Sequence, residues 1–458
     1  MREGNLEAPT RHPLDWLNPD FYDGGKIDDE LARVFEICHG CRRCVSLCNA
    51  FPTLFDLIDE GKTGEIDGVN RKDFGKVVDQ CYLCDVCYMT KCPYVPPHPW
   101  NVDFPHLMLR AKAADFKNGT VRRADRILSS TDTLGKLASI PVIVQLANGT
   151  LRSATARKVM QKALHVHPEA RLPAYHSDKF RDRASASAVH ASPAGGTVPA
   201  KAAIFSTCFI NYNDPGVGRD LLAVLDHNQI DYVFAKQEVC CGMPKFEVGD
   251  LQAVARLKDV NIPRLAEFAR AGYAILTPMP SCTLMFKQEL PLMFPDDVDV
   301  KAVQAAMFDP FEYLVARHKE GLLKTDFTRP LGKVAYHVPC HLRVQNVGQK
   351  TREALQLIPG TEITTIERCS GHAGTWGMKE AHFETAMKIG RPVFRQMSAA
   401  APDYISSDCA LAGMHIEQGI ERLASGPAPP KGAMKVHPIT LLRMAYGLGP
   451  DAKHMEAD

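Results

Sequence analysis

The chain has 458 residues, in which 54 Lys and Arg nearly balance 53 Asp and Glu, and it contains 15 cysteines. This length predicts about three folded units, and the net charge of +1 excludes a general electrostatic field for nucleic acid or an anionic membrane. Neither a signal-peptide core nor an apolar stretch of the ~18 residues that span a membrane is found, so we expect a cytoplasmic protein.

Ten of the 15 cysteines fall into tight groups, and the other five stand singly after residue 200. Grouped thiols indicate metal or redox chemistry rather than ordinary core packing. A secreted disulfide framework is a weaker interpretation, because the number of cysteines is odd and many neighbouring thiols are too close in sequence to pair without strain.

Two runs with the pattern C-x2-C-x2-C, each followed by a fourth cysteine, lie within the first 110 residues. In this arrangement three thiolates bind one iron–sulfur cube and the fourth binds the other cube. The spacing therefore predicts two 4Fe-4S clusters with crossed ligands. The expected ligands are Cys38, Cys41, Cys44 and Cys92 for one cluster and Cys81, Cys84, Cys87 and Cys48 for the other.

Zinc is the alternative cofactor for C-x2-C pairs, but zinc motifs normally place a dozen or more residues between their pairs. Here four thiols lie within 11 residues in the first run and within 12 in the second. Two departures from the bacterial ferredoxin pattern are that Asn49 follows Cys48 and that four residues, not three, separate Cys87 from Cys92. The polar stretch between the runs favours a helical two-cluster unit over residues 1–120.

A proline-rich segment then leads into a helix predicted from Phe104 to Lys117. We interpret His98 and His106 as surface histidines in a loop, with a role as ligand or proton carrier as the alternative. Helical periodicity with apolar and basic faces continues from Val121 to Leu172. Such helices could lie on a membrane surface or a partner protein, but packing against the rest of the chain is the favoured interpretation.

The stretch from His176 to Ala200 is rich in Ser, Ala, Gly and Pro and is interpreted as a flexible linker. Residues 121–200 are therefore expected to form a helical segment and a linker. The main domain boundary would lie at the end of this stretch.

The C-terminal half contains an internal repeat. The segment "KAAIFSTC", ending at Cys208, aligns with "KVAYHVPC", ending at Cys340, and each resembles a short apolar strand that ends in cysteine. The next landmarks keep the same order, because Cys208 to Cys240 spans 32 residues and Cys340 to Cys369 spans 29. We therefore predict a duplication, with repeats at residues 201–329 and 330–450.

Strands alternate with helices in each repeat, which predicts parallel α/β units. In the first repeat we expect a helix at Asp214–Asn228 and strands at Tyr232–Ala235 and Ala274–Pro278. Cysteines follow the strand ends, where parallel sheets build their sites, so the cysteines of one repeat should converge. Convergent thiols beside glycine indicate a metal or cluster site, with a redox-active dithiol as the rival. The overall fold class is α+β.

Several stretches carry a resemblance to a known family: "STCFINYNDPGVGRDLL", "CCGMP", "YHVPCH", "CSGHAGTWGMKEAHFETAMKIGRPVFRQ" and "VHPITLL". Together with the double cysteine motif they resemble iron–sulfur proteins like the C subunit of the anaerobic glycerol-3-phosphate dehydrogenase. More broadly, the two repeats resemble the CCG domains of glycolate oxidase iron–sulfur subunits, lactate-utilisation proteins and the B subunit of heterodisulfide reductase.

The resemblance implies an iron–sulfur electron-transfer subunit. It would pass electrons from a flavoprotein dehydrogenase, of the glycerol-3-phosphate or 2-hydroxy-acid type, toward quinone or a redox-protein acceptor. No G-x-G-x-x-G follows an expected strand, so an oxidoreductase partner that carries the flavin is required. The alternative is a disulfide- or peroxide-linked redox enzyme with its active site at the first repeat. The sequence leaves open peripheral association with the inner face of the cell membrane.

By position, the resemblance assigns two sites to the repeats. Cys208, Cys240, Cys241 and Cys282 would form the first, and Cys340, Cys369 and Cys409 the second. The second repeat departs from the family, because Ser370 replaces one thiol of the CCG motif and Ala412 replaces another. We therefore expect a further iron–sulfur cluster or metal in the first repeat, while the second keeps its glycine turn mainly for folding and docking.

Overall fold

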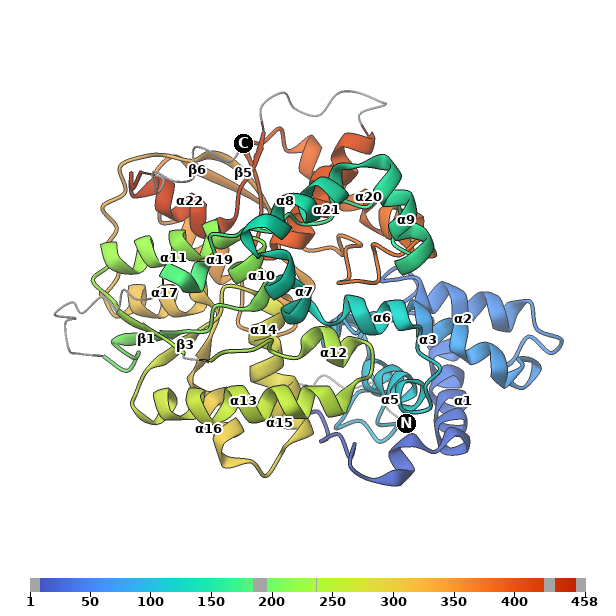
Figure 1. Cartoon of the computed structure of the whole chain (residues 1–458). Helices are drawn as coiled ribbons and strands as arrows, with labels where there is room; N and C mark the ends of the chain where they lie inside the picture. The colour runs from blue at the N-terminus through green and yellow to red at the C-terminus, as the bar shows by residue number, and fades with distance from the viewer. Residues whose placement is uncertain (1–8, 184–195, 236, 424–432, 450–458) are drawn as a thin grey trace.

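The computed structural model describes residues 9–183, 196–235, 237–423 and 433–449. It consists of a helical N-terminal unit, a helical bridge and two repeats that each contain a small parallel sheet (Figure 1). This arrangement confirms the expected α+β class and the helical character of the N-terminal unit. The unit boundaries proposed from the sequence stay predictions.

The N-terminal unit contains helices and no strand within its described residues. Its helices are α1 (Gly24–Cys41), α2 (Ala50–Asp59), α3 (Phe74–Gln80), α4 (Val86–Thr90) and α5 (Phe104–Lys117), with short 3-10 helices at Pro19–Tyr22, Ile66–Gly68 and Arg71–Asp73. Phe104 joins them, because its ring lies 4.7 Å from Phe51 and 6.1 Å from Phe35 between ring centroids. Burial of such rings supplies much of the stability of a small helical unit.

The two repeats contain four-stranded parallel sheets of identical order, β2-β1-β3-β4 and β6-β5-β7-β8. The strands are β1 (Lys201–Ile204), β2 (Asp231–Phe234), β3 (Ala274–Leu276), β4 (Met307–Phe308), β5 (Gly332–His337), β6 (Thr361–Ile366), β7 (Tyr404–Ser407) and β8 (Met434–Lys435). In the first sheet Ala202 is in register with Tyr232 and Ala274, and in the second Val334 is in register with Ile363 and Tyr404. The common topology agrees with the predicted duplication.

Helices surround both sheets. In the first repeat they are α10 (Cys208–Tyr212), α11 (Pro215–His227), α12 (Met243–Glu247), α13 (Leu251–Arg270), α14 (Pro280–Leu284), the π-helical η5 (Met285–Glu289), α15 (Leu290–Met293), α16 (Val298–Ala306) and α17 (Pro310–Lys319). In the second repeat they are α18 (Cys340–Arg343), α19 (Lys350–Leu355), α20 (Phe383–Ala399), α21 (Ala410–Leu423) and α22 (Pro438–Ala445).

The equivalent helices α17 and α22 of the two repeats begin in the same way. Pro310 and Pro438 open α17 and α22, where a missing backbone N–H costs nothing. The preceding residues cap the helices with their side chains, Asp309 through the Phe311 N–H and His437 through the Ile439 N–H.

The strand order places the cysteines at one edge of each sheet. The strand order reverses at β1, since β2 pairs on one side of it and β3 on the other, all in parallel. Open parallel sheets form their sites at the carboxyl ends of the strands that flank such a reversal. Cys208 follows β1, and Cys282 follows β3. Cys340 and Cys409 follow β5 and β7 in the same way.

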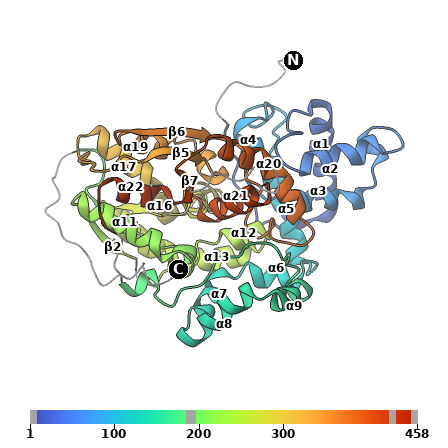
Figure 2. The same cartoon turned by 90° about the horizontal axis from the view of Figure 1, so that it is seen from above.

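A bridge of four helices crosses from the N-terminal unit to the second repeat: α6 (Arg123–Leu128), α7 (Thr131–Ala138), α8 (Pro141–Arg152) and α9 (Ala154–Leu164). Figure 2 shows α7, α8 and α9 along one edge of the molecule. The helical prediction is confirmed, but the bridge does not bury its whole apolar face in the chain. Val144 is the one buried hydrophobic residue within α8, whereas Val142 and Leu146 are 75% and 69% exposed.

Two expectations for loop residues were wrong. His106 is not a surface loop residue, because it lies inside α5 and its Nε2 contacts the Glu289 carboxylate at 3.0 Å. The described beginning of the expected linker is packed, since Phe180 is fully buried and the Arg181 guanidinium lies 2.5 Å from the Glu238 carboxylate. Residues 184–195 of that linker lie outside the described residues. Composition did not predict the burial of His106 or of Phe180, because elements distant in the sequence cover both residues.

A buried ionic network joins the N-terminal unit to the first repeat. The Arg11 guanidinium lies 2.6 Å from the Asp85 carboxylate, 2.8 Å from that of Asp103 and 3.6 Å from that of Glu289. Burial lowers the pKa of Arg11, but the surrounding carboxylates outweigh this effect and raise the pKa well above its ordinary value. The cation and its partners are therefore held together away from water.

Replacing this cation tests how much the network stabilises the fold. Arg11→Met leaves Asp85 and Asp103 buried without their cation, so we expect the free energy of unfolding to fall by about 3–5 kcal/mol. Arg71→Met removes an ion pair to Asp29 whose side chains are more than half exposed, and should change stability by less than about 1 kcal/mol. Thermal unfolding of both variants is the measurement, and equal losses would contradict the assignment.

Candidate functional site: four groups of thiols

The first N-terminal group lies where α1 ends. Cys38 and Cys41 are in the last turn of the helix, and Arg42 closes it in a left-handed conformation, which directs the chain back toward Cys44. Cys92 follows α4 and faces the same place. A small cavity of about 20 Å³ lies among these residues, and its other walls are formed by apolar side chains such as Phe51 and Phe55. It is lined by Cys38, Cys41, Cys44 and Cys92.

The second N-terminal group lines a much larger cavity of about 780 Å³. Four of its cysteines come from the N-terminal unit: Cys48, Cys81, Cys84 and Cys87. Two more thiols, Cys340 and Cys369, reach the same cavity from the second repeat. This second cysteine group of the N-terminal unit therefore borders the second repeat directly.

These groupings match the crossed scheme, in which Cys92 belongs with the first run and Cys48 with the second. The assignment of each thiol as a cluster ligand stays a prediction. The donor chemistry fits an iron–sulfur cluster, since each cavity is lined by four soft thiol donors from the N-terminal unit. Within the described ranges, no group of three or more Cys, His, Asp or Glu side chains is arranged to hold a single metal ion.

Burial governs the protonation of these thiols. It raises the pKa of Cys44 to about 12 and that of Cys92 to about 11, and it also raises the pKa of Cys38, Cys84 and Cys87 well above the ordinary value. Such thiols are protonated at neutral pH in the metal-free chain. A cationic cluster requires thiolates, so its insertion would release protons.

The four cysteines of the first repeat form a continuous row. The sulfur of Cys208 lies 3.9 Å from that of Cys240, and hydrogen bonds link Cys240 to Cys241 and Cys241 to Cys282. The Gly242 N–H donates to the Cys240 sulfur at 3.5 Å. Hydrogen bonds from its neighbours lower the pKa of Cys240 well below its ordinary value. The predicted convergence of this repeat's cysteines is thus present in the structure.

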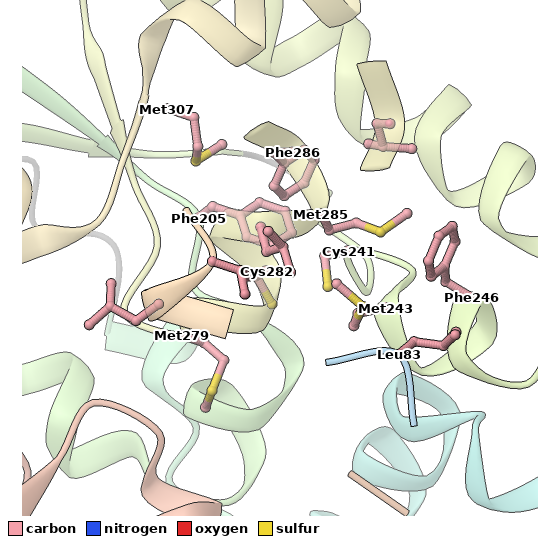
Figure 3. Close-up of a cluster of buried hydrophobic side chains, with 14 of the residues drawn as sticks. Leu83, Phe205, Cys241, Met243, Phe246, Met279, Cys282, Met285, Phe286 and Met307 are labelled. Carbon is pink, nitrogen blue, oxygen red and sulfur yellow. The ribbon is translucent and has the colours of Figure 1, made fainter. Parts of the chain in front are cut away.

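The surroundings of this row are rich in sulfur and aromatic rings. Figure 3 shows Cys241 and Cys282 beside Met243 and Met279, with Leu83 of the N-terminal unit reaching the same cluster. Met285 also lies in this cluster, where it is fully buried. Thr131 at the start of α7 approaches from outside, its hydroxyl 3.4 Å from the Cys208 sulfur and 3.7 Å from that of Cys240.

The second repeat brings together three thiols. Burial and the nearby thiols Cys369 and Cys409 raise the pKa of Cys340. Ser370 and Ala412, which stand at the expected positions of missing thiols, are both buried. The first repeat has four thiols and the second has three, and the expected asymmetry in cofactor content stays a prediction.

Tyr82 of the N-terminal unit packs against the second repeat. Its hydroxyl lies 3.2 Å from the Cys369 sulfur, and its ring centroid is 5.1 Å from that of Trp376. The Trp376 indole N–H donates to the Asp79 carbonyl at 2.8 Å, and its ring stacks on His382. Trp376 therefore packs against the N-terminal unit. The "CSGHAGTWG" turn thus contributes to docking.

The histidines that flank the second repeat's cysteines have different environments. His337 contacts the Ser407 hydroxyl and the Arg368 carbonyl, which accounts for both ring nitrogens. The His341 Nδ1 lies 3.0 Å from the Ser281 hydroxyl of the first repeat. The Nε2 of His372 is buried without a partner. Among these three, His372 is therefore the histidine whose buried ring nitrogen is available to a ligand.

A third cavity, of about 510 Å³, lies between the first repeat's thiols, the helical bridge and the second repeat. Cys208, Cys241 and Cys282 line one side, and His372 and His415 line another. Sequence reasoning missed His415, Thr131 and Tyr82 as parts of these sites. No local signal marks them, because each acquires its role from a segment far away in the chain.

The comparisons with known proteins agree with this duplicated architecture. The sequence pattern of the cysteine-rich domain (CCG) family matches residues 202–287 and 334–417. Each of the two matches falls on one of the parallel sheets, beginning within β1 in the first case and within β5 in the second.

Three relatives share part of this sequence, and two of them are named as subunits of a dehydrogenase and of a reductase. The chain is 29% identical over 352 residues to the C subunit of the anaerobic glycerol-3-phosphate dehydrogenase of Escherichia coli, and the match covers 76% of this chain and 83% of the relative. It is 29% identical to the B subunit of the fumarate reductase (CoM/CoB) of Methanothermobacter marburgensis over 53% of this chain and 46% of the relative. It is also 28% identical to lactate utilization protein A of Bacillus cytotoxicus, over 49% and 92% respectively.

The turn that follows Cys369 depends on glycine. Gly371 has φ +81°, and an added Cβ would lie 2.0 Å from the Ala386 carbonyl oxygen in α20. Gly371→Ala should lower the melting temperature strongly, because a left-handed residue costs about 1–2 kcal/mol and the clash adds to it. Gly272→Ala is the matched control, since Gly272 has φ +76° and open space around it. Similar melting temperatures for the two variants would contradict the role of this close approach.

Proposed function

We propose that this protein is an iron–sulfur electron-transfer subunit that accepts electrons from a flavoprotein dehydrogenase and passes them toward quinone or another acceptor. The observation that carries the proposal is the separation of eight N-terminal thiols into two sets of four, each around its own cavity. Bound 4Fe-4S clusters would supply one-electron transfer at these places.

The surrounding residues support such a role. The second thiol set, Cys48, Cys81, Cys84 and Cys87, shares its cavity with Cys340 and Cys369, so redox centres in the N-terminal unit would border the second repeat. Apolar walls beside the first set limit access of water to the thiols. The similarity to subunits of dehydrogenase and reductase complexes supports a flavoprotein partner.

A pair of double variants tests the crossed ligands. If Cys41 and Cys92 bind one cluster, Cys41→Ala/Cys92→Ala destroys only that cluster and leaves about four irons in the N-terminal unit. Cys41→Ala/Cys48→Ala then damages both clusters. Chemical iron analysis and spin counting of the reduced protein by electron paramagnetic resonance, after anaerobic purification, measure the result.

The reverse pattern, with the Cys41/Cys48 variant keeping one intact cluster, would show that each run binds its own cluster. Zinc without acid-labile sulfide in the unaltered protein would overturn the electron-transfer proposal itself. A Cys409→Ala variant serves as the matched control, because Cys409 lines neither N-terminal cavity and its loss should leave both N-terminal signals unchanged.

A separate prediction concerns the second repeat. Ser370→Cys restores one thiol of the motif, but Ala412 still stands where another would be. We therefore expect the iron content of Ser370→Cys to equal that of the unaltered protein. An additional cluster in this variant, seen as extra iron and sulfide per chain, would show that the second repeat retains a nearly complete site.

A further inference from the structure

We propose that the cavity between the first repeat's thiols and the second repeat is a binding site for a lipid-soluble quinone. The inference rests on the proposed function and assigns the quinone acceptor to this cavity. The cavity has a volume of about 510 Å³, in the range of pockets that enclose small molecules. Most of its lining is apolar, with side chains such as Leu134, Leu164 and Met414 contributing.

Two imidazoles supply the polar groups that such a ring needs. The Nε2 atoms of His372 and His415 are both buried and have no hydrogen-bond partner in the structure. The two rings line the same cavity with their centroids 6.1 Å apart. A buried nitrogen without a partner is costly, and a ligand hydroxyl that hydrogen-bonds to it would relieve that cost.

The protonation of these rings suits a neutral ligand. Burial lowers the pKa of His372 to about 3 and that of His415 to about 4, so both rings are uncharged at neutral pH. His415 hydrogen-bonds the Ala386 backbone through its other ring nitrogen, which leaves Nε2 as an acceptor. This atom can accept a hydrogen bond from the hydroxyl of the reduced ring.

The cavity lies where electrons could reach a bound quinone. Cys208, Cys241 and Cys282 border it directly, so a redox centre at the first repeat would lie at its wall. Reduction of a quinone takes two electrons and two protons, and its two carbonyls become hydroxyls. The electrons would come from the flavoprotein through the reduced clusters, and the protons from solvent. Glu247, whose pKa burial raises to about 7, also lines the cavity and can hold a proton there.

The outer surface of the bridge explains how a lipid-soluble ligand would arrive. Ile127 lines the cavity and is also 45% exposed, so the cavity reaches the surface beside the bridge. Exposed apolar side chains continue along it: Leu137, Ile140, Val142, Ile143, Leu146 and Val159. The exposed Arg152, Lys158 and Lys162 of α8 and α9 add positive charge beside them, whereas Arg157 is buried. Apolar and basic side chains together favour the surface of an anionic bilayer.

No helix in the described ranges has the length and apolarity to cross a bilayer. Contact through the bridge would therefore be peripheral. Figure 2 shows that α7 and α8 lie at the edge of the molecule, where a flat surface can reach them.

Equilibrium dialysis of the cluster-containing full chain against decyl-1,4-naphthoquinone tests the site. The unaltered protein should bind one molecule per chain. Ala147→Trp fills the cavity from α8 and should abolish binding, whereas Gly149→Trp on the same helix, with open space around it, should not. In dialysis against the reduced probe, decyl-1,4-naphthohydroquinone, His415→Leu should weaken binding about tenfold, because the hydrogen bond that Nε2 accepts from the hydroxyl is lost. His165→Leu changes an exposed histidine that is not part of the lining and is its control.

No binding to the unaltered protein, or equal binding to Ala147→Trp, would overturn the inference. Iron content and reduction of the clusters by a flavoprotein are measured on the same samples. Normal clusters without quinone binding refute the site alone, and absent clusters refute the proposed function. Competition by an aliphatic disulfide that displaces the quinone would favour the thiol-redox alternative for this cavity and would also overturn the inference.

Sedimentation with vesicles tests whether the quinone enters the cavity from a bilayer or from solution. Val142→Glu/Leu146→Glu should lose at least tenfold of the binding to phosphatidylglycerol vesicles and keep the binding of the soluble probe. Val298→Glu, at an exposed apolar residue of α16, should leave vesicle binding unchanged. Equal vesicle binding by the double variant and the unaltered protein would overturn the access route from the bilayer.

Discussion

The placement of one short segment, Cys81–Cys87, between the two repeats is the constraint on which the rest of the structure depends. Neighbouring residues in it face opposite ways: Tyr82 contacts Cys369 and Trp376 of the second repeat, while Leu83 belongs to the buried cluster of the first. Leu83 and Asp85 adopt positive φ values of 52° and 60°, which are costly for residues other than glycine. The buried ion pair between Asp85 and Arg11 helps to hold this conformation.

This arrangement explains why the two repeats differ although their sheets are alike. The second repeat packs its cysteine turn against the N-terminal thiols, and Trp376 and Tyr82 fill the interface between them. The first repeat packs its thiols against the helical bridge, where Thr131 approaches Cys208 and an apolar cavity remains. The two sheets have the same topology, but the cysteines at the carboxyl ends of their strands pack against different neighbours. The chemistry available at each set of cysteines depends on that neighbour.

The sequence was informative wherever a signal is local. Cysteine spacing predicted which thiols group together, and the repeated strand-cysteine landmarks predicted two sheets of one topology. It failed where tertiary burial decides. Phe180 lies in a segment of loop-like composition and His106 lies at the start of a predicted helix, yet distant partners bury both. The contact of Tyr82 with Cys369 joins residues 287 positions apart, and no periodicity or motif encodes such a pairing. The amphipathic bridge could be predicted as helical, but periodicity does not identify what its apolar face meets.

The last helix has a practical consequence for spectroscopy. Within α22, Arg443 pairs with Asp220 of the first repeat, and the neighbouring Tyr446 hydroxyl donates to the Lys324 carbonyl. Because α22 packs against the first repeat, a polypeptide truncated after that repeat would expose the surface that α22 covers. Spectra of such fragments would report damaged folds as well as missing centres. The individual redox signals are therefore best separated by single substitutions in the intact polypeptide.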